Sequence, residues 1–136
     1  MLFEYALSTP KEGFINITPQ LREAMTKNGV IDGIAVVFCP HTTAGITINE
    51  NADPDVTTDM LFGLSKAFPD RPEFWHAEGN SAAHLKASLT GSSVTVIVDK
   101  GRLVLGTWQG VYFCEFDGPR SRNFSIKIIE SSKAGA

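Results

Sequence analysis

The last third of the chain constrains the fold most, because strand-like segments follow one another there with only turns and short loops between them. Alternating apolar residues predict strands over Val94–Val98 and Phe124–Glu130, and a continuous apolar run predicts another over Val111–Phe116. Turn residues follow two of these segments, at 99–101 and 117–119. This order indicates largely antiparallel sheets. It disfavours a doubly wound nucleotide fold, for which the sequence has no G-x-G-x-x-G or phosphate-loop motif.

Four further strands are expected earlier in the chain. In the first, Phe3, Tyr5 and Leu7 alternate with other residues and share one side. Ile34–Cys39 is apolar on both alternations, which predicts a central strand covered on both faces. The other two expected strands are Phe14–Ile17 and Ala44–Glu50.

Three helices are expected, each with a recognisable start. Thr18-Pro19 predicts the first, with Thr18 as the N-cap, and Asn28-Gly29 ends it. Asp53-Pro54 opens the second in the same way, and Asn80 caps the third, which ends at Gly91. With the strands, these helices predict a single α+β domain over residues 1–136, with largely antiparallel, sandwich-like sheets.

Helical spacing also predicts which faces of the second and third helices are buried. On the third helix, Ser81, His84 and Ser88 share a polar face, so His84 is not expected in the core. The residues expected to be buried are Val56, Met60, Leu64 and Phe68 in the second helix and Ala82, Leu85 and Leu89 in the third.

Composition weakens two classes of partner. Fifteen acidic against twelve basic residues give a net charge of -3, so no overall basic field favours nucleic acid. No apolar run approaches the roughly 18–20 residues that span a bilayer, so no membrane partner is expected. Cys39 and Cys114 lie in apolar runs, where we expect buried thiols rather than a disulfide framework. A soluble, cytoplasmic protein is the expectation.

The chain has three histidines, and all of them lie in segments rich in turn and polar residues. His41 follows a strand break, His76 lies in the loop before the third helix, and His84 lies one turn into that helix. Three neutral imidazoles meeting at one point would suit Zn²⁺ and leave a fourth position for water or substrate. Glu50 and Glu78 are candidates to orient a ring nitrogen. The alternative is three unrelated surface or capping histidines.

A second group of residues would suit an anion. Asn80 and Ser81 begin a helix, where free backbone N–H groups can hold a phosphate, and Lys86 would add a charge. Arg120 and Arg122 bracket a turn and have the geometry for bidentate phosphate contacts. The alternative is an ordinary capped helix with two exposed arginines.

Two glycines interrupt a strand-like stretch around Trp108 and Gln109, which suggests a bulge or a close backbone approach. Trp108 would stack on a heterocycle and Gln109 would hydrogen-bond its edge. The alternative is that Trp108 fills core or subunit-interface area.

Taken together, several runs resemble the signature of the YjbQ-like family, formerly an uncharacterised protein family. The resemblance covers nearly the whole chain. The runs that carry it are His41–Asn51 (HTTAGITINEN), Asp53-Pro54, Gly79–Ser88 (GNSAAHLKAS), Leu105–Gln109 (LGTWQ) and Glu115–Arg122 (EFDGPRSR).

The resemblance implies a compact α+β fold, commonly a homotrimer, and His41, His76 and His84 as ligands of a divalent metal. Zinc is the expected ion and magnesium the alternative. Members are labelled secondary thiamine-phosphate synthases, which join hydroxymethylpyrimidine diphosphate to thiazole phosphate. In that transferase reaction Arg120 and Arg122 would neutralise the leaving diphosphate.

Two other functions use the same residues. The first is a metal-dependent hydrolase of a phosphate ester or amide, with Glu50 as proton shuttle. The second is a trimer that binds a metal or a small anionic metabolite and catalyses nothing. In each case the expected small-molecule partner is phosphorylated or anionic.

Overall fold

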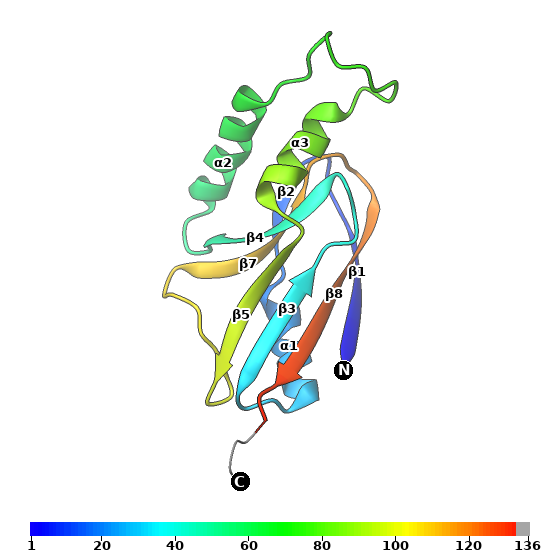
Figure 1. Ribbon diagram of the computed structural model, residues 1–136. Helices are drawn as coiled ribbons and strands as arrows, with labels where there is room; N and C mark the ends of the chain where they lie inside the picture. The colour runs from blue at the N-terminus through cyan, green and yellow to red at the C-terminus, as the bar shows by residue number, and fades with distance from the viewer. Residues whose placement is uncertain (133–136) are drawn as a thin grey trace.

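The computed structural model describes residues 1–132 and consists of two antiparallel sheets and three helices (Figure 1). The end of the expected domain, residues 133–136, lies outside the described residues. The helices are α1 (Thr18–Asn28), α2 (Pro54–Ala67) and α3 (Ser81–Thr90). The strands are β1 (Leu2–Ser8), β2 (Gly13–Asn16), β3 (Gly33–Phe38), β4 (Ala44–Glu50), β5 (Ser93–Asp99), β6 (Arg102–Leu103), β7 (Gln109–Glu115) and β8 (Ser121–Glu130).

The large sheet has the strand order β1-β8-β3-β5-β6, and the small sheet has the order β2-β7-β4. Every strand pair is antiparallel, so the predicted fold class is confirmed. The strands of the last third are divided between the two sheets: β5 and β6 pair in the large sheet, β7 is central in the small one, and β8 returns to the large sheet. The predicted break around Trp108 is the place where the chain crosses between the sheets.

The main core lies between the two sheets. Phe113 of β7 and the alternating Phe124, Ile126 and Ile128 of β8 are buried there, as their alternation predicted. Helix α1 packs against β7 and β8 and buries Leu21, Ala24 and Met25 in the same core. The alternating residues of β1 are partly buried against it. The periodic patterns in the sequence therefore identified this core correctly.

A second, smaller core covers the outer face of the small sheet, where α2 and α3 lie (Figure 1). It contains Ala83 and Ala87 of α3, and Gly45 of β4 lets the end of this helix approach closely. A Cβ on Gly45 would lie 2.5 Å from the carbonyl oxygen of Gly91. Because small residues make this contact, Leu85 and Leu89 lie exposed, and their prediction as the buried face was wrong.

Helix α2 is only half-covered. Its predicted stripe of Val56, Met60, Leu64 and Phe68 is partly exposed, and none of its residues is fully buried. The expectation that this stripe buries the helix was therefore only half right. Phe62 projects from another side of α2 and is 64% exposed.

Strand β3 also differs from expectation. Its inner residues Ala35 and Val37 are buried, but Phe38 is exposed on the outer face. Ile97 of β5 and Ile129 of β8, which pair with Ile34, are exposed there too. The prediction that this strand is covered on both faces was wrong for the single chain, because both helix α1 and the small sheet pack on its inner face.

The starts of α1 and α2 follow different rules. Asp53 caps α2 as predicted, since its side chain accepts a hydrogen bond from the Asp55 N–H. Thr18 is not the cap of α1: its hydroxyl accepts from the Val111 N–H at 2.9 Å and ties the helix to β7.

Across residues 1–132, none of the helices is long and apolar enough to cross a membrane.

Candidate functional site

His41 lies just beyond the end of β3, where Pro40 stops the strand. Its Nε2 is 3.0 Å from both the carbonyl oxygen and the amide nitrogen of Asn123 in β8. The pairing of β3 with β8 ends at Phe38 and Ser125, and beyond it the His41 side chain contacts the backbone of β8 in place of a further β3 residue. The edge-to-face contact with Phe113, at 6.3 Å between ring centroids, fixes the ring from the core side.

The surroundings of His41 favour a neutral ring. Burial, followed by the positive charge of Arg122, lowers the pKa of His41. Nε2 lies at hydrogen-bond distance from a donor, the Asn123 N–H, and from an acceptor, the Asn123 carbonyl, so the tautomer decides which of the two bonds forms. With the proton on Nε2, the ring donates to the carbonyl and its Nδ1 is free to ligate a metal.

His84 connects the other two histidines. With His41 it lines a cavity of about 420 Å³, whose wall includes Thr42, Ser88 and Ser92. The His76 ring lies edge-on to the His84 ring, with 5.6 Å between the centroids. The segment after β3 and the distant segment formed by α3 and its preceding loop thus bring their histidines to one region. Among residues 1–132, however, no three His, Cys, Asp or Glu side chains form a ready-made metal cluster.

Directly beneath His41 lies a buried ion pair between Glu115 of β7 and Arg122 of β8. Arg122 donates from Nε at 2.7 Å and from Nη2 at 2.6 Å to the two carboxylate oxygens. Its Nη2 also donates to the Thr43 hydroxyl, and the Thr9 hydroxyl donates to Glu115. Glu115 is 0% exposed and Arg122 only 5%. Arg122 is therefore committed to the framework, and it is not free to bind an anion as predicted.

The start of α3 is not arranged as the predicted anion site. Asn80 occupies the cap position without a capping side-chain bond; its Nδ2 donates to Asp117 at 2.9 Å and to Glu78 at 3.3 Å. Arg120 donates to the same Asp117 carboxylate at 3.0 Å, and Ser81 is partly buried. Two carboxylates therefore stand where an anion would bind, and they repel one.

The charge of Asp117 supports this conclusion. Burial alone would raise its pKa, but hydrogen bonds from Asn80 and Arg120 lower it, so the group is a carboxylate. Lys86, the other predicted cation, is buried and ion-paired to Glu12 at 3.3 Å. Neither Arg120 nor Lys86 is thus a free cation for phosphate.

Glu50, Trp108 and Gln109 lie together at the far end of β4, around a cavity of about 330 Å³. Glu50 follows Ala44 by six positions in this strand, which places it about 20 Å from the histidine end. It therefore does not support a histidine-bound metal within one chain, contrary to its predicted role. The Gln109 side chain accepts from the Gly106 N–H and closes its own turn, while Trp108 is exposed.

Sequence reasoning missed the groups that hold His41 in place. Asn123 lies just before the predicted strand Phe124–Glu130, and nothing local marks it as a partner of His41. Glu115 did carry a signal: it is an acid within the apolar run Val111–Phe116, and a buried charge needs a partner.

Comparison with known proteins places this geometry in a wider group. The family model described as UPF0047 protein YjbQ-like matches residues 4–131. The UPF0047 protein MJ1081 of Methanocaldococcus jannaschii is 55% identical over 130 residues, covering 95% of this chain and 94% of that protein. The UPF0047 protein YugU of Bacillus subtilis is 53% identical over 123 residues, covering 90% and 93%.

A solved structure agrees with the fold. The crystal structure of an uncharacterized conserved protein of the yjbq/upf0047 family from Clostridium acetobutylicum superposes with a TM-score of 0.91 at 60% identity. It covers 93% of this chain and 99% of that one. The two chains therefore share the fold over the covered residues.

Proposed function

The chain belongs to the UPF0047 YjbQ-like family, and from this premise we propose that it is a metal-dependent hydrolase of a small phosphorylated metabolite, with zinc held by His41, His76 and His84. The observation that carries the proposal is that His84 shares a cavity with His41 and contacts the ring of His76. Neutral imidazoles are preferred ligands of zinc, whereas magnesium prefers oxygen.

The chain's own residues supply the rest of the site. The backbone of Asn123 orients the His41 ring, and burial, followed by the charge of Arg122, disfavours the protonated form that could not bind an ion. The hydroxyls of Thr42, Ser88 and Ser92 line the cavity beside His41 and His84, where they would hydrogen-bond a phosphate ester. A bound zinc ion would supply Lewis acidity at this position.

The transferase reaction implied by the resemblance fits this cavity less well. A leaving diphosphate needs cationic groups beside it, but Arg122 is neutralised by Glu115 and Arg120 is paired with Asp117. In hydrolysis of a monoester the leaving group is an alcohol, which carries less charge than a diphosphate. Amide hydrolysis and binding without turnover use the same cavity and are distinguished by the experiment below.

The metal proposal is tested by elemental analysis of tag-free protein and of His41→Ala, His76→Ala and His84→Ala. We expect about one zinc per chain, and a fall in zinc affinity of more than about 100-fold in each variant, because each removes a direct ligand. Glu50→Gln is the matched control and should keep its zinc. Wild-type protein that takes up no transition metal, even after reconstitution, would overturn the proposal.

The reaction class is tested on the zinc-loaded protein. Release of phosphate from small phosphate esters, lost in the three histidine variants, supports the hydrolase. Formation of thiamine phosphate from the two phosphorylated precursors would instead support the transferase and contradict the hydrolase. Zinc binding without turnover of esters, amides or precursors would reduce the function to binding.

We also propose that the protein assembles as a homotrimer. Support comes from large side chains that a single chain leaves uncovered, above all Trp75, which is 99% exposed, and Phe62 and Leu89 on the helical side. Light scattering should give the mass of three chains, and a monomer at micromolar concentration would contradict the proposal.

A further inference from the structure

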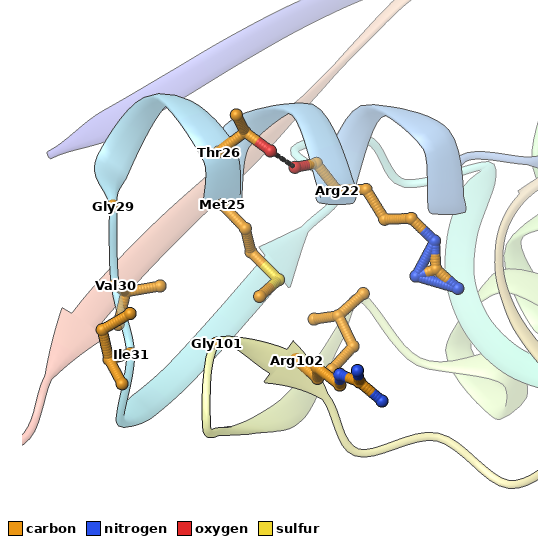
Figure 2. Close-up of a pocket in the computed structure, with 9 residues that line it drawn as sticks. Arg22, Met25, Thr26, Gly29, Val30, Ile31, Gly101 and Arg102 are labelled. Carbon is orange, nitrogen blue, oxygen red and sulfur yellow. Dashed lines mark hydrogen bonds between the residues drawn. The ribbon is translucent and has the colours of Figure 1, made fainter.

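A cavity of about 520 Å³ lies between the end of α1 and the turn that joins β5 to β6 (Figure 2). Its volume is in the range typical of small-molecule sites. None of the motifs that carry the family resemblance contributes to it, and it shares no lining residue with the histidine cavity. Strand β3, whose six residues span about 17 Å, runs between the two regions.

One half of this cavity is apolar. Met25 and Val30 form its floor and are largely buried, Leu103 of β6 forms a wall, and Ile31 lies exposed at the rim. Figure 2 shows the Met25 side chain pointing into the space between the helix and β6. A ligand entering here would remove apolar surface from water on several sides.

The other half carries two arginines without partners. The side chains of Arg22 and Arg102 make no ion pair and no hydrogen bond with the described residues. The other three arginines, Arg71, Arg120 and Arg122, each bind a carboxylate. In Figure 2 both guanidinium groups extend to the same side of the cavity, away from Val30 and Ile31. No acidic residue lines the cavity, and Asp99, the strand partner of Arg102, makes no ion pair with it.

Backbone hydrogen bonds hold the walls in place. The Gly101 N–H donates to the Ile31 carbonyl at 2.8 Å, which ties the β5–β6 turn to the chain leaving α1. Gly29, in the left-handed conformation with φ 76°, ends α1 by donating to the Met25 carbonyl. A cavity shaped by main-chain contacts is formed before its ligand arrives, which reduces the entropy lost on binding.

We propose that this cavity binds a small molecule with an apolar body and a single anionic head group, a carboxylate or a phosphate. Arg22 and Arg102 hold the head group, because guanidinium groups match both anions in geometry. The apolar body lies over Met25 and Leu103, toward Val30. The negative end of the α1 dipole, near Gly29, disfavours the reverse orientation.

The test uses the assembled wild-type protein and calorimetric titration with four probes. They are 4-phenylbutyrate, 3-phenylpropyl phosphate, the uncharged isostere 4-phenylbutyramide, and acetate, which has the charge without the body. We expect saturable binding of at least one arylalkyl anion, and binding about tenfold weaker or more for the amide and for acetate. The stronger of the two anions identifies the head group.

Two single variants, Arg22→Gln and Arg102→Gln, should each weaken the bound anion about tenfold, whereas Arg71→Gln, a matched exposed arginine elsewhere, should not. Amide NMR shifts on titration should concentrate at Gly29, Ile31 and Gly101. No saturable binding, equal binding of the amide or of acetate, or unchanged affinity in both arginine variants would each overturn the proposal. Zinc content plays no part in this readout, so its failure is separate from failure of the proposed function.

Discussion

Arg122 and Arg102 lie at opposite ends of the large sheet, and they show what burial does to a charged side chain. Arg122 is enclosed and makes hydrogen bonds to Glu115 and Thr43. Arg102, with Arg22 beside it, is exposed, and its side chain meets no acid among the described residues. Both kinds of arginine look alike in the sequence. Only the buried one is part of the framework, because a charge removed from water must be paired, whereas an exposed charge stays available for a ligand.

The largest effect is expected when the buried ion pair loses one partner. Arg122→Met leaves the fully buried Glu115 carboxylate without its cation, and we expect a loss of about 3–5 kcal/mol in the free energy of unfolding, measured by denaturant titration. The exposed control Arg120→Met, which breaks the pair with Asp117, should cost no more than about 1 kcal/mol.

The double variant Arg122→Met with Glu115→Leu separates the cost of an orphaned charge from that of lost packing. It should recover a large part of the stability, because replacing both partners of a buried pair by apolar residues is often neutral. If Arg122→Met were no more destabilising than Arg120→Met, the buried pair would not be part of the framework.

Acid provides a second, gentler test of the same pair. Burial alone would raise the pKa of Glu115, but hydrogen bonds from Arg122, Thr9 and the Asp117 N–H outweigh it, and the net pKa lies below the ordinary value of 4.5. A carboxyl whose pKa is lower in the folded state stabilises the fold fully above its unfolded pKa. That contribution disappears as the pH falls through the folded pKa.

We therefore expect the free energy of unfolding of the wild type to fall more steeply than that of the double variant as the pH decreases below about 4.5. Urea titrations across this range measure the difference. Parallel curves for the two proteins would assign the acid sensitivity to other carboxylates, such as Asp117.

The smallest effect is expected at the other end of the sheet. Arg22→Gln and Arg102→Gln remove exposed charges that contact no acid, so each should change the free energy of unfolding by no more than about 0.5 kcal/mol. A loss above 1 kcal/mol in either variant would show that these arginines also serve the framework, and the contrast between the two ends would disappear.

Much of the fold was predictable because it follows local periodicity. The alternation of Phe124, Ile126 and Ile128 identified the inner face of β8, and Asp53-Pro54 located the start of α2. The two-residue strand β6 was missed, because so short a segment has no period to detect. The exposed position of Leu85 was missed for a different reason: α3 approaches β4 through alanines and Gly45, and this depends on the partner surface.

The candidate site was less predictable than the fold. The sequence indicated His41, His76 and His84 as a group, but the spacing did not show which ring contacts which. It also misplaced Glu50, since strand β4 carries that residue away from His41, and it treated Arg122 as a free cation. The deciding contacts join different strands or segments, as Asn123 of β8 holds His41 and Glu115 of β7 pairs with Arg122 of β8.

The sequence by itself determined the α+β class, the periodic core and the family, because each rests on residues close together in the chain. Only the tertiary structure decided which charges are neutralised, which helix faces stay open, and that two unpaired arginines face an apolar cavity. The physical reason is that burial and pairing depend on contacts between segments. Such contacts form when the sheets and helices pack, and no local sequence pattern indicates them.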